Sequence, residues 1–300
     1  MTPSDGSRDP ARVREVFQIN DSAQVVTIGG RGPPLLVLSG PGVAFSRMPK
    51  LFAPWEAAFT VAHWDQPGAA QSAGPVSLDR LVADGLAVLE ALRGRLGVAK
   101  VAVLGISGGS VVGLAMAAAR PDLVSVYAGA GQFVDWAAQD RLSYHLVLKA
   151  ARKSGDPAAA AELEALGPPP YSDTAADRVK AKYAGALTPA EQAAFADPSV
   201  MAPPEGAPEI DQRALAAAAY EAVRGELMAF KARDLGAVAT PVVFLQGTLD
   251  AYSVSSEVEA YAQEIGAVYA PIEGGGHSAM FMVRRMLDLL VEHVRPLAAA

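Results

Sequence analysis

Short runs of apolar residues recur along the chain and predict most of its strands. Two runs, at 15–19 and 24–28, are separated by the short segment NDSA and predict a β-hairpin. The other runs are apolar at successive positions, which is typical of strands buried on both faces of a parallel sheet. They cover residues 34–40, 59–65, 100–107, 124–131 and 241–247, with a weaker candidate at 266–274.

Segments with helical spacing of apolar residues lie between these runs. The helices predicted in this way cover residues 77–95, 110–119, 256–265 and 279–294. Ser256 and Glu259 have the spacing of a capping box, and the last helix is expected to stop before Pro296. Strands that alternate with helices predict an α/β fold with a mostly parallel sheet.

The region from about 133 to 235 breaks this alternation, because it contains no convincing strand. It predicts helices at 134–153, 157–166, 174–186, 188–195 and 210–233. We therefore expect a core domain formed by residues 1–132 and 236–300. Residues 133–235 are expected to form a helical domain inserted between two strands of the sheet.

Composition and charge narrow the range of partners. The chain has 300 residues, 51% of them hydrophobic and 19% charged, which favours a globular protein with a sizeable core. A net charge of −7 without a long basic run argues against nucleic acid and against an anionic membrane surface as partners. The absence of cysteine excludes disulfides, zinc–thiolate sites and cysteine nucleophiles, and fits a cytoplasmic location.

The beginning of the chain is polar and lacks the apolar core of a signal peptide. Apolar runs elsewhere fall well short of the ~20 residues that cross a bilayer. We therefore expect a soluble protein whose first ten or so residues are poorly ordered.

A single serine stands between glycines in the stretch VAVLGISGGSVVGLAMAAARP, which covers 101–121. Residues 105–109 match G-x-S-x-G between a predicted strand and a predicted helix, the context of a nucleophile elbow. In such a tight turn the serine stands above the sheet edge, and the helix N-terminus stabilises negative charge beside it. Ser107 is therefore the candidate nucleophile. The alternative is a glycine-rich turn with an incidental serine.

A serine nucleophile needs a base, and the chain has four histidines. His63 lies inside a predicted strand, His145 in the helical insertion and His293 on the terminal helix. His277 instead lies in the glycine-rich loop EGGGHSAM, after the last predicted strand. Because such a loop carries an imidazole over the ends of the strands, His277 is the candidate base. The alternative is a loop histidine without a partner.

The base needs an acid that orients it. Asp250 ends the stretch PVVFLQGTLD, directly after a predicted strand, although it also suits a turn before a helix. Asp65 also follows a strand, but it precedes the serine and is assigned to loop structure. The order Ser107, Asp250, His277 is that of the G-x-S-x-G hydrolases.

An oxyanion hole needs two backbone N–H donors. One is expected from Gly108, the residue after the nucleophile, and the other from the loop SGPG that follows an apolar strand. Gly40 is the candidate in that loop. A plain turn glycine is the alternative there.

With these residues in place, the sequence resembles the α/β-hydrolase superfamily and, within it, the proline iminopeptidase (prolyl aminopeptidase) group. The resemblance covers roughly residues 13–295. LSGPG (38–42) is similar to the HGGPG loop of the group, WDQPGAAQS (64–72) to its WDQRGxGxS segment, and GISGGS (105–110) to its GGSWGS elbow. The resemblance implies an α/β-hydrolase fold, a Ser107–His277–Asp250 triad and a helical cap domain over the site.

The chain also departs from the pattern of the group. Leu38 and Ser39 replace His and Gly, Pro67 replaces Arg, Ala70 replaces Gly, and Gly108 replaces Trp. The last change is expected to widen the pocket. The group reads a free α-amine with carboxylates of the cap, but the cap acids of this chain follow no recognisable motif and are expected to be solvated. These acids are Glu162, Glu164, Glu191, Glu221 and Glu226.

The sequence therefore predicts a serine hydrolase that cleaves an ester, an amide or a short peptide and needs no metal or organic cofactor. It is expected to be a carboxylesterase or a proline iminopeptidase-like aminopeptidase. Two alternatives are a non-catalytic ligand-binding protein on the same scaffold and an acyltransferase that uses the same acyl-enzyme.

Overall fold

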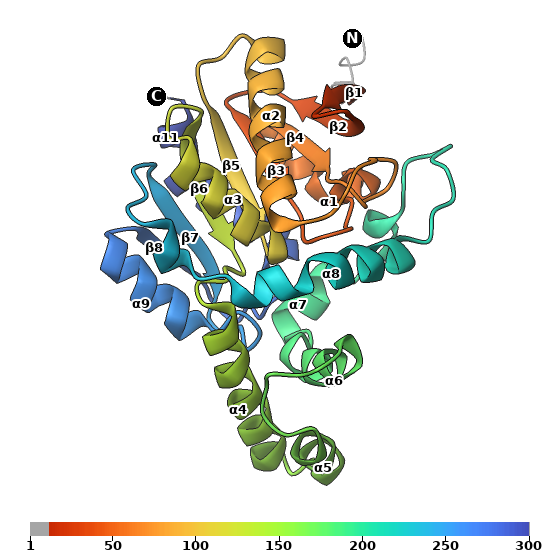
Figure 1. Cartoon of the computed structure of the whole chain (residues 1–300), viewed down its shortest axis with the longest axis vertical. Coiled ribbons are helices and arrows are strands. Elements are labelled where there is room, and N and C mark those ends of the chain that lie inside the picture. The colour runs from red at the N-terminus through yellow and green to blue at the C-terminus, as the bar shows by residue number, and fades with distance from the viewer. Residues whose placement is uncertain (1–11, 300) are drawn as a thin grey trace, which may run out of the picture.

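The computed structural model describes residues 12–299, and its centre is an eight-stranded sheet in the order β1-β2-β4-β3-β5-β6-β7-β8 (Figure 1). β1 and β2 form the predicted hairpin, β2 pairs antiparallel with β4, and all other pairs are parallel. The predicted α/β fold with a mostly parallel sheet is confirmed. The strands are β1 (Val13–Ile19), β2 (Ser22–Gly30), β3 (Pro34–Leu38), β4 (Thr60–Asp65), β5 (Val101–Ile106), β6 (Val124–Ala130), β7 (Val242–Gly247) and β8 (Val268–Ile272).

The central strands are buried on both faces, as their continuous apolar sequence predicts. Successive residues of a strand point to opposite faces. In β3, Leu36 and Leu38 join one hydrophobic cluster, and Leu35 and Val37 join the cluster on the other side. The sheet therefore separates two hydrophobic cores, one on each of its faces.

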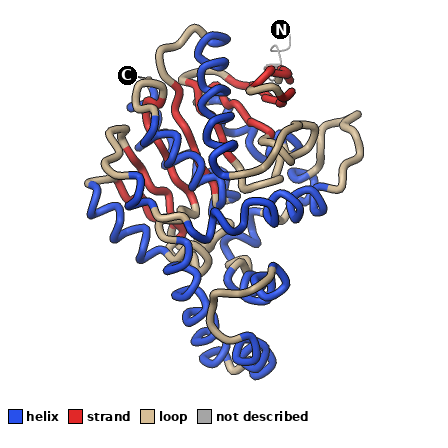
Figure 2. Tube along the Cα trace, in the orientation of Figure 1, coloured by secondary structure: helices blue, strands red, loops and turns tan. Residues whose placement is uncertain are grey.

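Helices cover both faces of the sheet (Figure 2). α2 (Leu78–Leu96), α3 (Gly108–Ala119) and α9 (Ser255–Ile265) contribute to one core. α1 (Pro49–Phe52) and α10 (Val283–Leu289) contribute to the other. Because strands β3 to β8 are parallel, their carboxyl ends lie at one edge of the sheet, where a site is expected.

Two helix termini differ from the prediction. α9 begins at Ser255, with Val254 at its N-cap and no side-chain cap, so the predicted capping box of Ser256 and Glu259 is wrong. The C-terminal helical segment continues past the expected stop, through a π-helical turn at Leu290–Val294 into α11 (Arg295–Ala298). Pro296 lies in the first turn of α11. A backbone N–H at that position has no acceptor within the helix, so the missing N–H of proline costs little.

A helical segment lies between β6 and β7, and its outer helices extend away from the sheet (Figure 1). α4, α5 and α6 have a small hydrophobic cluster of their own, which includes Tyr144, Leu148 and Leu163. The predicted domain boundaries at 133 and 235 stay a prediction. The helices are α4 (Trp136–Ser154), α5 (Pro157–Leu166), α6 (Thr174–Ala184), α7 (Pro189–Ala194) and α8 (Gln212–Ala229).

Across residues 12–299, no helix combines the length and apolar character needed to span a membrane. The expected disorder of the first ten residues lies outside the described part of the chain.

Candidate active site

Ser107 occupies the sharp turn between β5 and α3. Its backbone has φ 53° and ψ −124°, a combination that a residue with a side chain rarely adopts. The turn is held by hydrogen bonds from Ser107 N–H to Ala130 O (2.9 Å) and from Ser110 N–H to Ser107 O (2.9 Å). The hydroxyl therefore stands at the carboxyl edge of the sheet, as the elbow motif predicts.

Close packing explains the glycine that ends the motif. A Cβ atom at Gly109 would lie 2.4 Å from Ser39 O and 2.5 Å from Leu38 O. These are backbone atoms at the end of β3, so they cannot move aside cheaply. Glycine at this position lets α3 begin directly against the neighbouring strand.

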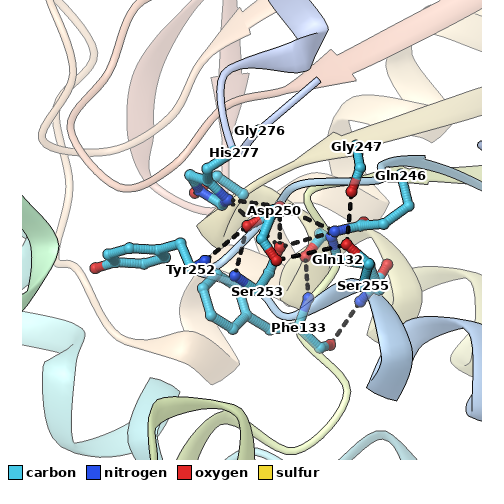
Figure 3. Close-up of polar contacts among 12 residues, drawn as sticks. Gln132, Phe133, Gln246, Gly247, Asp250, Tyr252, Ser253, Ser255, Gly276 and His277 are labelled. Atoms are coloured by element: carbon cyan, nitrogen blue, oxygen red, sulfur yellow. Dashed lines mark hydrogen bonds and ion pairs between the residues drawn. The ribbon is translucent and has the colours of Figure 1, made fainter. Parts of the chain in front are cut away.

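The structure brings Ser107, His277 and Asp250 into one hydrogen-bonded chain. Ser107 Oγ lies 2.9 Å from His277 Nε2, and His277 Nδ1 lies 3.0 Å from Asp250 Oδ2. Asp250 follows β7 and His277 follows β8, so three strand ends supply the three side chains. Figure 3 shows the imidazole above the carboxylate of Asp250.

Further donors surround the carboxylate of Asp250, which is buried. Its Oδ1 accepts the N–H groups of Tyr252 (2.8 Å) and Ser253 (2.9 Å). Its Oδ2 also accepts the Ser253 hydroxyl (2.6 Å) and the Gln246 amide (2.9 Å). Burial alone would raise the pKa of Asp250, but the imidazole and the hydrogen bonds from His277 and Ser253 outweigh it and hold the pKa below its usual value.

Ser253 and Gln246, which Figure 3 shows beside Asp250, were not identified from the sequence as partners of its carboxylate. Gln246 Oε1 accepts the N–H of Gln132 (3.1 Å), so this amide links the end of β6 to the carboxylate. The spacing D-x-x-S at 250–253 is a local signal for a serine that bonds the aspartate. No local signal identifies Gln246, because its role depends on a neighbouring strand.

The two candidate oxyanion donors are neighbours. Gly108 is the first residue of α3, so its N–H has no acceptor within the helix. A Cβ built on Gly40 would lie 3.8 Å from the backbone nitrogen of Gly108. A Cβ on Gly108 itself would lie 2.7 Å from Cδ of Pro41. Pro41 thus lies directly beside Gly108, and the expectation that the missing tryptophan ring widens the pocket stays a prediction.

The segment similar to WDQRGxGxS supports the loop after β3. Gln66 Nε2 donates to Ser39 O (2.8 Å), and Ser46 Oγ donates to Asp65 at 2.7 Å and 2.8 Å from its two carboxylate oxygens. Asp65 is the buried last residue of β4, so its assignment to loop structure is wrong. Burial raises its pKa to about 6, despite the Ser46 hydroxyl and nearby arginines. Ala70, where the group has glycine, keeps φ 45°.

Aromatic rings lie beside the imidazole. The ring of Tyr252 lies 4.7 Å from that of His277, and the ring of Phe133 lies 6.1 Å away. The ammonium of Lys180 from α6 lies over the ring of Tyr252, 5.1 Å from its centroid. Lys180 forms a buried ion pair with Asp140 of α4. The helical segment thus contacts a tyrosine that packs beside the imidazole.

The other histidines lie outside this arrangement. His63 is buried in β4 against Phe52, and neither of its ring nitrogens has a hydrogen-bond partner among the described residues. Burial, with a smaller contribution from Arg12, lowers the pKa of His63 to about 3. His145 packs beside Tyr144, and His293 lies 3.6 Å from Glu292.

The cap acids do not share one environment. Glu162 and Glu164 are exposed and pair with Lys182 and Arg152. Glu191 is completely buried, so the expectation of solvation is wrong for it. Its carboxylate bonds two backbone N–H groups, one of them beside His277. In the part of the chain that the structure describes, no cluster of histidine and acidic side chains has the arrangement of a metal site.

Comparisons with known proteins show which sequences and folds this chain is similar to. The model of the alpha/beta hydrolase family matches residues 35–292. A proline iminopeptidase-related protein from Thermus thermophilus superposes with a TM-score of 0.68 at 19% identity, over 96% of this chain and 99% of that chain. No curated protein matches the sequence significantly.

Hydrolases of other kinds superpose almost as well. A thermophilic esterase from Thermogutta terrifontis gives a TM-score of 0.62 at 19% identity, covering 96% of this chain and 99% of that chain. A 2-hydroxy-6-oxo-6-phenylhexa-2,4-dienoate hydrolase from Rhodococcus gives 0.64 at 18% identity, covering 95% and 99%. At these identities the similarity shows the fold and leaves the substrate open.

Proposed function

The chain belongs to the alpha/beta hydrolase family, and we propose that it is a serine hydrolase that cleaves small esters or amides through an acyl-enzyme on Ser107. The observation that carries the proposal is the continuous hydrogen-bonded chain Ser107–His277–Asp250. It combines a strained serine, a base within hydrogen-bond reach and a buried carboxylate that orients the base.

The chemistry follows from the positions of these atoms. Ser107 Oγ attacks the carbonyl carbon while its proton passes to His277 Nε2. The bond to the leaving group breaks as Nε2 returns that proton to the leaving oxygen or nitrogen. Water then attacks the acyl-enzyme and gives a proton to Nε2, which passes it to Oγ as the acid departs.

Backbone amides are proposed to stabilise the tetrahedral oxyanion. Gly108 N–H at the start of α3 and Gly40 N–H in the adjacent loop are the two donors, and the helix N-terminus adds its partial positive charge. A donor of this kind contributes about 10²–10³ in rate. No step in this scheme requires a metal ion or an organic cofactor.

The surroundings of the site favour esters over peptides with a free N-terminus. A buried ammonium without a partner costs several kcal/mol, so an aminopeptidase needs a carboxylate that is free to receive it. Three buried acids of the helical segment already have partners. Asp140 pairs with Lys180, Asp177 with Arg224, and Glu191 with backbone N–H groups.

Aminopeptidase activity remains the second candidate, because motifs in the chain resemble the proline iminopeptidase group and one structural neighbour is a proline iminopeptidase-related protein. The aromatic rings of Tyr252 and Phe133 beside His277 favour short or aromatic acyl groups in either case.

Two measurements test the proposal. A fluorophosphonate probe should label the protein, and the Ser107→Ala variant should not be labelled; labelling that persists in the variant contradicts the assignment. The kcat/KM for a p-nitrophenyl ester should then exceed that for a prolyl arylamide. A large excess for the prolyl arylamide, with rejection of its N-acylated form, would instead identify an aminopeptidase.

A further inference from the structure

Glu191 is a completely buried carboxylate in α7, far from Ser107 in sequence and outside the sheet. Its Oε2 accepts the N–H of Thr188 (2.8 Å), which completes a capping box at the start of α7. Its Oε1 accepts the N–H of Gly276 (2.9 Å), the residue directly before His277. One side chain therefore joins the inserted helical segment to the loop that carries the candidate base.

The contact between Glu191 and the Gly276 N–H is not needed to cap α7. A capping box needs one acidic oxygen for the N-cap N–H. A fully buried carboxylate is costly unless its remaining lone pairs are also bonded, and here the Gly276 N–H provides that compensation. The fit is close, because a Cβ on Gly276 would lie 3.0 Å from Glu191 Oε2. Burial of this charge thus depends on the position of the Gly276 peptide.

The loop before His277 needs anchors, because residues 274–276 are all glycine and have wide backbone freedom. Two anchors come from the turn after β7. Gly274 N–H donates to Thr248 Oγ1 (3.1 Å), and Leu249 N–H donates to Gly275 O (2.8 Å). These bonds hold the start of the loop. The bond to Glu191 holds the peptide nearest the imidazole.

We propose that Glu191 is a positioning residue that sets the distance from His277 Nε2 to Ser107 Oγ. Through Glu191, this distance depends on the position of α7. The inference rests on the proposed role of His277 as base. Glu191 touches neither the substrate nor the reacting atoms. Displacement of α7 would release the Gly276 peptide and move the imidazole, and a misplacement of about 1 Å costs about 10²-fold in rate.

The test compares three variants. Glu191→Ala removes both bonds, and we expect kcat to fall about 10- to 100-fold while KM changes less than about threefold. Glu191→Gln keeps one acceptor oxygen for the Gly276 N–H and should recover part of the lost kcat. Thr188→Ala is the matched control. It removes the Thr188 hydroxyl that caps the same helix (3.3 Å to Glu191 N) but leaves the Glu191–Gly276 bond in place.

Thermal unfolding separates positioning from simple loss of structure. Thr188→Ala should lower stability by about 1 kcal/mol, as removal of an N-cap does, with kcat within about twofold of the original protein. All activity assays are run at a temperature well below the lowest thermal unfolding midpoint among the variants. The proton NMR signal of the His277–Asp250 hydrogen bond gives a readout without substrate, and it should broaden in Glu191→Ala but not in Thr188→Ala.

Several results would overturn the inference. Equal kcat in Glu191→Ala and Thr188→Ala would reduce Glu191 to a helix cap. A raised KM with unchanged kcat in Glu191→Ala would make it a substrate-binding residue. His277→Ala separates this inference from the proposed function. If that variant keeps full activity, the proposed function is wrong. If it is inactive while Glu191→Ala keeps its kcat, the positioning role alone is wrong.

Discussion

Ser253 donates a hydrogen bond to Asp250 at the same carboxylate oxygen that faces the imidazole of His277. The Ser253 Oγ–Asp250 Oδ2 distance is 2.6 Å, and Oδ2 lies 3.0 Å from Nδ1 of His277. Ser253 Oγ also lies 3.4 Å from Nδ1. The hydroxyl therefore keeps Oδ2 ionised and aimed at the ring, which prepares the carboxylate to stabilise an imidazolium.

Replacing Ser253 with alanine should lower kcat about tenfold, since a hydrogen bond to a charged group is worth about 1.5–3 kcal/mol. The change should also raise the pKa of Asp250, because it removes one of the bonds that depress it. A depressed carboxylate pKa stabilises the folded state above the unfolded pKa, and that stability is lost as pH falls through the folded pKa. As the pH is lowered, the free energy of unfolding of Ser253→Ala should therefore begin to decrease at a higher pH than that of the original protein.

The neighbouring Ser255→Ala variant is the control for this prediction. Ser255 Oγ donates to Gly247 O (2.6 Å) and makes no hydrogen bond to the Asp250 carboxylate in the described structure. Steady-state kinetics and urea unfolding from pH 3 to pH 7 compare the two variants. Equal effects of Ser253→Ala and Ser255→Ala on kcat would contradict the role given to Ser253.

Ser107 carries backbone strain that glycine would relieve. At φ 53° and ψ −124° strain costs on the order of 1–3 kcal/mol, and the added chain entropy of an unfolded glycine offsets about 0.4–1 kcal/mol of the gain. Ser107→Gly should therefore unfold at higher urea concentration than Ser107→Ala, by about 1 kcal/mol in free energy. Both variants should be inactive. A glycine variant that is no more stable than the alanine variant would show that the turn is unstrained.

Features fixed by local chemistry could be predicted from sequence. The elbow is one of them, because G-x-S-x-G lies between an apolar strand and an apolar helix. His277 and Asp250 could be placed near Ser107 for a related reason. Asp250 follows a strand that is apolar at successive positions, His277 follows the weaker strand candidate at 266–274, and parallel strands end at one edge.

Features that depend on distant partners could not be predicted. Glu191 was expected to be solvated because the acids of the helical segment follow no recognisable motif, yet its second partner lies 85 residues away. Pro41 occupies the space next to Gly108 because the loop after β3 packs against the start of α3, which no spacing reveals. The helix at the C-terminus was expected to end before Pro296, but proline in a first turn begins a helix as readily as it ends one.

The buried pair of Lys180 and Asp140 should behave as one unit. Lys180→Met leaves the Asp140 charge without its partner inside the helical segment, and we expect a loss of about 3–5 kcal/mol in the free energy of unfolding. Replacing both residues together, as Asp140→Leu/Lys180→Met, removes both charges and should cost far less than the sum of the single changes. A double-mutant cycle in urea measures the difference. Additive single costs would mean that the two charges do not interact.

His63 makes the stability of the protein sensitive to acid. Burial first, and Arg12 second, lower its pKa in the folded state to about 3, whereas an unfolded histidine has a pKa of about 6.5. Between these values the unfolded chain binds a proton that the folded protein does not. The free energy of unfolding therefore decreases as pH falls through this window, by up to about 1.4 kcal/mol per pH unit from this residue alone.

Replacing His63 with leucine should remove this contribution and flatten the pH dependence of stability. Between pH 7 and pH 5, the original protein should lose about 2 kcal/mol more than His63→Leu does. Urea unfolding at the two pH values measures this difference directly. His293→Gln is the control, since His293 is partly exposed and lies in the C-terminal helical segment. If His63→Leu and the original protein lose stability in parallel while the pH falls, the ring of His63 is not held neutral by burial.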